Sequence, residues 1–194
     1  MTTQLQDLFP EFAKLLQDKS DYIELFACFD ANSEGWLQAE LLHFLAWNKA
    51  VEELRPQRRG LGSIKRESCD FWIKLTDCAV WCEIKSFCTN YCGSPGKNIT
   101  DRIDGVLKAM SRVAGYAHSD GSHAVVIALV YPFAEGEAER KAWDKHCRKL
   151  LTGPLTEFQE HKIRFHVGPD KFARLILWSE PSAELGPTSP GRAQ

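Results

Sequence analysis

The chain is organised around residues 67–87, which read ESCDFWIKLTDCAVWCEIKSF. Apolar residues alternate with other side chains on both sides of the polar pair Thr76-Asp77, a pattern typical of a β-hairpin. Successive strand side chains point to opposite faces, so Glu83 and Lys85 are predicted to project from the same face of the second strand. A turn at Thr76-Asp77 brings Asp70 on the first strand level with Glu83, and the two carboxylates are predicted to converge.

Converging carboxylates are the hard oxygen ligands that a divalent cation binds, with positions left for water and a substrate phosphate. The order Asp70, a hairpin, then Glu83-Ile84-Lys85 resembles the PD-(D/E)xK nuclease superfamily, with Cys69 in place of the proline of that name. The resemblance implies an α/β fold of three layers, a mixed central sheet flanked by helices, of the restriction-endonuclease-like type. It implies Mg²⁺ or Mn²⁺ at Asp70 and Glu83, the Ile84 carbonyl as a further ligand, and a water positioned or activated by Lys85.

A helix is predicted upstream of the hairpin, capped by Asn32 or Ser33. Its apolar stripe includes Leu37, Leu41 and Leu45, and Glu40 lies beside that stripe. Members of the superfamily often carry an additional metal-binding glutamate on this helix, so the resemblance assigns that role to Glu40. The alternative is that Glu40 is a solvated acid at the edge of the stripe.

Hydrophobic periodicity predicts the remaining elements. Helices are expected over 4–16, with Pro10 kinking or dividing the helix, over 20–29 with Ser20 as its cap, from Thr100 to 117, and over 135–151. A strand covered on both faces is expected at 124–130, and shorter strands at 163–167 and 174–178. The length of 194 residues suggests a single domain over 1–179 with an N-terminal helical segment over 1–32. The tail 180–194 is rich in Pro, Ser and Gly and is predicted to be disordered.

The net charge of −2 argues against a generally basic nucleic-acid-binding surface, although it is compatible with a local basic groove. Basic residues occur between 55 and 66, in the loop before Thr100 and at the start of the following helix. Arg66, Lys97 and Arg102 are therefore predicted to contact phosphate. The alternative is that they are ordinary solvated charges of loops and a helix surface.

Other chemistries have less support. The C-x3-C spacings of Cys78, Cys82, Cys88 and Cys92 suggest a thiolate metal site, but the first two lie on a strand, where small buried cysteines are common. The histidines show no HExxH or H-x-H spacing, and no glycine-rich phosphate loop is present. Seven cysteines without a regular framework, no signal-peptide pattern and no long apolar run predict reduced thiols, a cytoplasmic location and no membrane partner.

The sequence therefore predicts a divalent-metal-dependent nuclease that hydrolyses phosphodiester bonds in DNA. RNA is a second candidate substrate, and a homodimer is compatible with the resemblance. The alternative of a different class is a catalytically inactive domain of the same fold that binds protein or nucleic acid.

Overall fold

The computed structural model describes residues 3–57, 68–89, 99–168 and 170–181. Within these residues there are five helices and six strands. The helices are α1 (Thr3–Asp18), α2 (Ser20–Cys28), α3 (Glu34–Ala46), α4 (Ile99–Asp120) and α5 (Glu137–Leu150). The strands are β1 (Val51–Pro56), β2 (Phe71–Leu75), β3 (Ala79–Cys88), β4 (His123–Ala134), β5 (Glu157–Arg164) and β6 (Lys171–Ser179). None of the helices described is long and apolar enough to cross a membrane.

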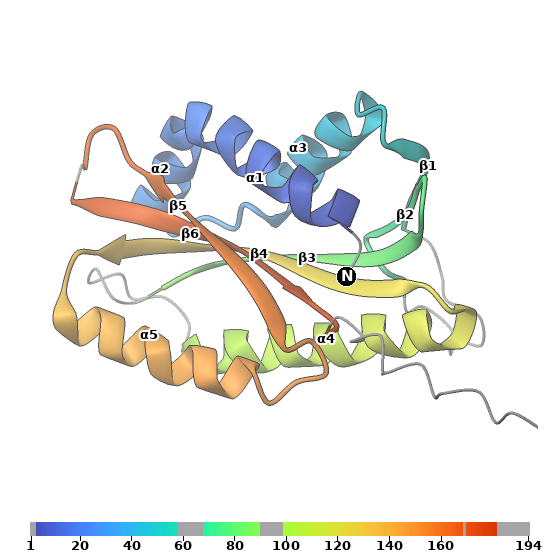
Figure 1. The fold of residues 1–194 in the computed structure, drawn as a ribbon. Helices are drawn as coiled ribbons and strands as arrows, with labels where there is room; N and C mark the ends of the chain where they lie inside the picture. Colours follow the sequence, from blue (N-terminus) through green and yellow to red (C-terminus); the bar gives the residue numbers. More distant parts are fainter. Residues whose placement is uncertain (1–2, 58–67, 90–98, 169, 182–194) are drawn as a thin grey trace, which may run out of the picture.

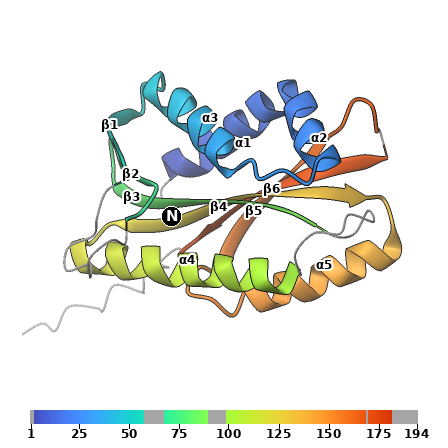
Figure 2. The same ribbon diagram turned by 180° about the vertical axis from the view of Figure 1, so that it is seen from behind.

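The six strands form one mixed sheet in the order β1-β2-β3-β4-β6-β5. Strands β3 and β4 are parallel and are connected through α4, whereas the other neighbouring pairs are antiparallel. Helices α1, α2 and α3 cover one face of the sheet, and α4 and α5 cover the other (Figures 1 and 2). The predicted α/β architecture with a mixed sheet between two helical layers is confirmed.

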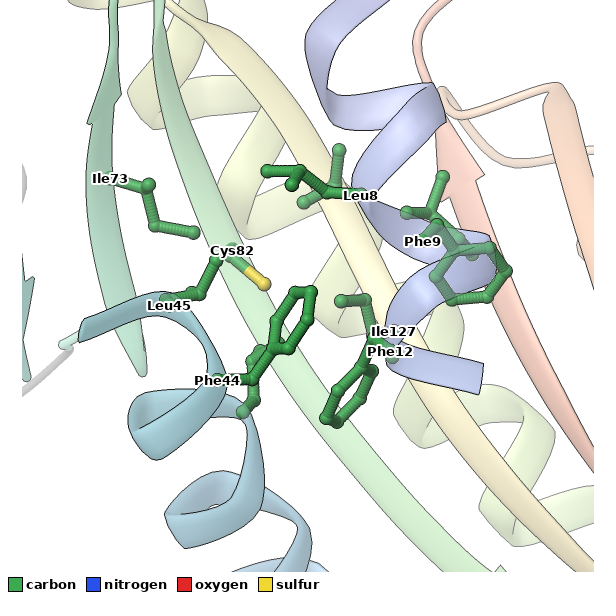
Figure 3. Close-up of a pocket in the computed structure, with 11 residues that line it drawn as sticks. Leu8, Phe9, Phe12, Phe44, Leu45, Ile73, Cys82 and Ile127 are labelled. Atoms are coloured by element: carbon green, nitrogen blue, oxygen red, sulfur yellow. The ribbon is translucent and has the colours of Figure 1, made fainter. Parts of the chain in front are cut away.

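Each face of the sheet has its own apolar core. Strand β4 is buried along nearly its whole length and contributes alternate residues to both cores, as its continuous apolar sequence predicts. On the first face, Phe12 of α1 and Phe44 of α3 pack over the sheet (Figure 3). Cys82 lies among these apolar side chains, so it is a core residue.

The N-terminal helices differ from the prediction in their details. Helix α1 runs through Pro10 and is not divided there. Proline removes one helical hydrogen bond, but the deep burial of Phe12 and Leu16 against the sheet offsets that loss. Helix α2 begins at Ser20, which is buried and makes no capping hydrogen bond, and the N-cap position is Lys19.

The C-terminal strands are longer than predicted. Strand β5 begins at Glu157, well before the predicted start at position 163, and alternates exposed with partly buried residues at the edge of the sheet. An edge strand with polar residues carries no apolar run, which is the signal on which the prediction rested. Strand β6 ends at Ser179, and residues 182–194 of the predicted disordered tail 180–194 lie outside the described residues.

Candidate active site

The β2–β3 hairpin forms as predicted, with Phe71 opposite Cys82 at the end of the paired region. Strand β3 continues beyond this pair for six more residues, 83–88, along which no β2 pairing is recorded. Asp70 immediately precedes Phe71 and is therefore level with Glu83. Its carboxylate Oδ2 accepts a hydrogen bond from the backbone N–H of Ile84 at 2.8 Å. The Asp70 carboxylate thus supplies the hydrogen-bond acceptor that a neighbouring strand would otherwise provide to the backbone of β3.

Glu83 is a buried carboxylate on the face of β3 that packs against α4. Only 3% of its side chain is exposed. One oxygen, Oε1, contacts Lys85 Nζ at 3.0 Å and also accepts a hydrogen bond from Arg112 of α4. The other oxygen, Oε2, is buried and has no hydrogen-bond partner. Burial, and then the nearby charge of Asp70, raise the pKa of Glu83 above its ordinary value, despite the opposing effect of the two cations.

Lys85 contacts both acidic and backbone groups of the site. Its Nζ donates to the Ile84 carbonyl at 2.8 Å and lies 3.5 Å from Oε1 of Glu34, in addition to its contact with Glu83. Burial alone would lower the pKa of Lys85, but the carboxylates of Glu83, Glu34 and Asp70 outweigh it and raise the pKa above the ordinary value. Lys85 is therefore an ammonium cation at neutral pH.

The carboxylate that α3 brings to Lys85 belongs to Glu34 in its first turn. Glu40 instead forms an ion pair with Lys19, between α1 and α2. The structure therefore does not bring Glu40 together with Asp70 and Glu83, and we replace it by Glu34 as the acidic residue that α3 contributes. The physical reason is the direction of α3, whose N-terminal end is the one anchored beside β3.

A buried polar network anchors that end of α3. The hydroxyls of Ser33 and Ser86 lie 2.5 Å apart, and the Tyr131 hydroxyl lies 2.9 Å from that of Ser33. Tyr131 also donates to the Ala31 carbonyl at 2.7 Å. The Ser33 hydroxyl therefore contacts the sheet and makes no capping bond to α3. The other predicted cap, Asn32, accepts a hydrogen bond from the Glu34 N–H at 3.0 Å through its side-chain oxygen. Because Ser86 follows Lys85 and Ser33 precedes Glu34, the network fixes the distance between these two charged residues.

We expect Tyr131→Phe to lower the free energy of unfolding by about 1–3 kcal/mol, because it leaves the buried Ser33 hydroxyl and Ala31 carbonyl without their shared partner. Urea denaturation of the two proteins measures the change. The control is Tyr22→Phe, which removes the same hydroxyl from an exposed residue of α2. Equal effects of the two substitutions would show that the network does not hold α3.

Arg112, like Glu34, is a site residue that the sequence did not predict. The sequence places it outside the apolar stripe of its helix, with Arg102 and Lys108. In the structure its guanidinium reaches Glu83, and its Nε is buried without a hydrogen-bond partner. A signal was present, because position 112 lies three residues after Ala109 and four before Tyr116, both of which are buried.

We expect Arg112→Met to lower the free energy of unfolding by about 1–3 kcal/mol without added metal, because a buried carboxylate loses one of its two cations. Lys108→Met, an exposed position of the same helix, is the control. If a divalent cation binds Glu83, Mn²⁺ should raise the melting temperature of Arg112→Met by more than that of the wild type. Identical shifts in both proteins would argue that Arg112 and the metal do not share this carboxylate.

Of the three residues predicted to contact phosphate, the structure describes Arg102. Arg66 and Lys97 lie outside the described residues. Arg102 lies near Cys88 at the carboxyl end of β3, where its charge opposes the burial that raises the pKa of that thiol to about 12. Cys88 is three residues further along β3 than Lys85, a rise of roughly 10 Å.

The cysteines do not form a metal centre in the part of the chain that the structure describes, which excludes Cys92. Cys69, which occupies the proline position of the resembled motif, is buried and its Sγ lies 2.7 Å from the Cys82 carbonyl oxygen. Burial raises the pKa of Cys69 above its ordinary range, so this residue is a neutral thiol.

The hairpin offers a divalent cation a small set of oxygen donors. No three His, Cys, Asp or Glu side chains come together in a metal-binding arrangement within 3–57, 68–89, 99–168 and 170–181. The donors that do meet are two carboxylates, Asp70 and Glu83, and the carbonyl of Ile84. Two carboxylates with several waters suffice for Mg²⁺. The buried, unpartnered Oε2 of Glu83 fits such a ligand, since an orphaned buried carboxylate oxygen is otherwise costly.

Comparison with known proteins gives no family assignment: neither the models of protein families, nor the curated proteins, nor the solved structures yield a match to this chain.

Proposed function

We propose that this protein is a divalent-metal-dependent nuclease of the restriction-endonuclease-like type, hydrolysing phosphodiester bonds in DNA, with RNA as a second candidate substrate. The observation that carries the proposal is the arrangement of Asp70, Glu83 and Lys85 where β2 begins and β3 continues beyond its pairing with β2. Two acids and a lysine beside the end of the β2–β3 pairing supply metal ligands and a cation for a phosphate at a single point.

Mg²⁺ or Mn²⁺ fits Asp70, Glu83 and the Ile84 carbonyl, where it would polarise the phosphate and lower the pKa of a bound water. Asp70 keeps one carboxylate oxygen on the Ile84 N–H, which fixes its orientation and leaves its other oxygen for a ligand. Glu83 similarly uses Oε1 for Lys85 and Arg112 and has Oε2 unpartnered. The side chains are thus oriented by contacts that do not use all their oxygens.

Lys85 acts in this proposal as a hydrogen-bond donor and a positive charge. Without a metal, the surrounding carboxylates raise the pKa of Lys85, so it carries a proton at neutral pH. Its ammonium can orient that water or a phosphate oxygen and stabilise the negative charge that develops in the transition state. Glu34, which contacts Lys85 at 3.5 Å, holds the ammonium in place.

One observation favours the alternative of a catalytically inactive binding domain. Lys85 and Arg112 together neutralise Glu83, and Lys85 already occupies the Ile84 carbonyl, so the cluster is stable as an ion-pair network. In that alternative, metal ions would neither bind the hairpin nor change the protein's stability.

Cleavage assays separate the two functions. Labelled single-stranded DNA, duplex DNA and RNA are incubated with the wild-type protein in Mg²⁺, Mn²⁺ or EDTA. The proposal expects cleavage of at least one substrate with metal and none with EDTA. Absence of cleavage under every condition would contradict the enzyme and support the binding domain.

A further inference from the structure

A groove lies directly beside the candidate active site, between α3 and the adjoining ends of β1 and β2. One wall is the α3 face that carries Gly35, Gln38 and Ala39. The opposite wall includes Gln57 and Asp70. Asp70 therefore belongs both to the groove and to the active site, and Gly35 directly follows Glu34, which contacts Lys85. A ligand in this groove would lie next to a phosphate bound at Asp70 and Glu83.

The α3 wall is open at Gly35 and Ala39, where its side chains are small, whereas Gln38 and Leu42 extend from the same wall. Gly35, Gln38 and Ala39 follow the helical spacing of a single face, and two of the three carry no side chain beyond Cβ. A Cβ atom added at Gly35 would meet no other atom of the described residues within 4 Å. The face is also exposed at Gly35 and Ala39.

The opposite wall is held in place by the backbone. The N–H of Gln57 donates to the carbonyl of Asp70 at 2.8 Å. Gln57 adopts a φ of +50°, a left-handed conformation that glutamine rarely takes. This turn ends β1 at the groove and fixes Gln57 beside Asp70.

The chemistry of the lining matches a nucleobase better than a phosphate. No lysine or arginine is among the described residues that line the groove, and its charged member, Asp70, repels anions. The side chains of Gln38 and Gln57 each provide an amide donor and acceptor, which are the groups that bind the edges of bases. The remaining lining is apolar or small, as the face of a base requires.

We propose that this groove binds an unpaired nucleobase of the nucleotide next to the cleaved phosphate, so that the protein prefers single-stranded or unpaired nucleic acid. The inference rests on the proposed nuclease function for its orientation, since Asp70 connects the groove to the site. A base in a duplex has its edge paired and its faces stacked, so it can enter the groove only after it leaves the helix.

Binding without metal tests this proposal independently of cleavage. The affinity for three fluorescein-labelled probes is measured by anisotropy in EDTA: a short oligothymidylate, an abasic oligomer of the same length, and the oligothymidylate paired with its complement. We expect the oligothymidylate to bind about tenfold more tightly than either of the other two. Equal affinity for the three probes, or no binding to any of them, would overturn the proposal.

Variants that fill the groove with a larger side chain test whether oligothymidylate binds there. Gly35→Leu and Ala39→Leu should reduce the affinity for oligothymidylate to that of the abasic oligomer, because either leucine occupies the space in front of α3. The control is Gly115→Leu on α4, which is also an exposed helical glycine with free space around its Cβ. Circular dichroism verifies that each variant is folded, and the second groove variant serves if one is not. Unchanged affinity in a folded groove variant would contradict the assignment of this surface.

The outcomes separate this inference from the proposed function. A protein that binds oligothymidylate through the groove but cleaves nothing in Mg²⁺ or Mn²⁺ contradicts the nuclease and retains the base-binding groove. A protein that cleaves nucleic acid yet binds the three probes equally retains the nuclease and contradicts the groove.

Discussion

Asp70→Asn is expected to weaken Mn²⁺ binding by about a hundredfold or more and to abolish cleavage. The substitution removes one of two charged ligands from a site where few others are present. The fold should be retained, because the asparagine carbonyl can still accept the hydrogen bond that Asp70 receives from the Ile84 N–H. Calorimetric titration with Mn²⁺ and the cleavage assay measure the two effects.

The matched control for this prediction is Asp77→Asn. Asp77 is an exposed aspartate in the turn of the same hairpin, at the end remote from Glu83. The Asp77→Asn variant should bind Mn²⁺ and cleave substrate as the wild type does. If Asp70→Asn retains wild-type Mn²⁺ affinity, the metal does not bind at this hairpin.

Lys85→Met is expected to lower the rate of cleavage by a factor of about 100 to 1,000, an increase in the activation barrier of about 2.7–4 kcal/mol, if Lys85 acts as one preorganised donor to the transition state. The affinity for Mn²⁺ should be unchanged or higher. Lys85 Nζ contacts Glu83 and the Ile84 carbonyl, so its positive charge competes with a metal ion for the same oxygens.

The cleavage rate and the Mn²⁺ affinity of Lys85→Met together distinguish a catalytic role of Lys85 from a structural one. Lys74→Met on the neighbouring strand is the control, because Lys74 is exposed and forms a surface ion pair with Glu52. In an inactive binding domain, Lys85→Met would change stability alone. A parallel loss of Mn²⁺ affinity and cleavage in Lys85→Met would also contradict its assigned role, since the lysine would then support metal binding.

The sequence predicted the hairpin well because its signals are local. Period-two alternation and the polar turn at Thr76-Asp77 fix both the strands and their register, and the register places Asp70 level with Glu83. The helix after β3 was equally predictable from its apolar stripe. The resemblance to a nuclease superfamily rests on these same residues and stays a prediction.

The rest of the site depends on contacts between distant segments. Glu34 and Glu40 lie on the same helix, three residues before and three after Leu37, so periodicity alone does not tell which one faces β3. That choice is made by the network of Ser33, Ser86 and Tyr131, whose members are far apart in the sequence. Arg112 was missed for a related reason, because a long side chain at the edge of a buried face can reach either solvent or the sheet.

The most direct test of the account is the position of a bound metal ion. Crystals of the protein soaked in Mn²⁺ and measured at a wavelength where manganese scatters anomalously would locate it. We predict a peak within about 2.0–2.6 Å of carboxylate oxygens from both Asp70 and Glu83, with Lys85 still adjacent. A manganese ion found only at other residues, or none at this hairpin, would contradict the proposed active site.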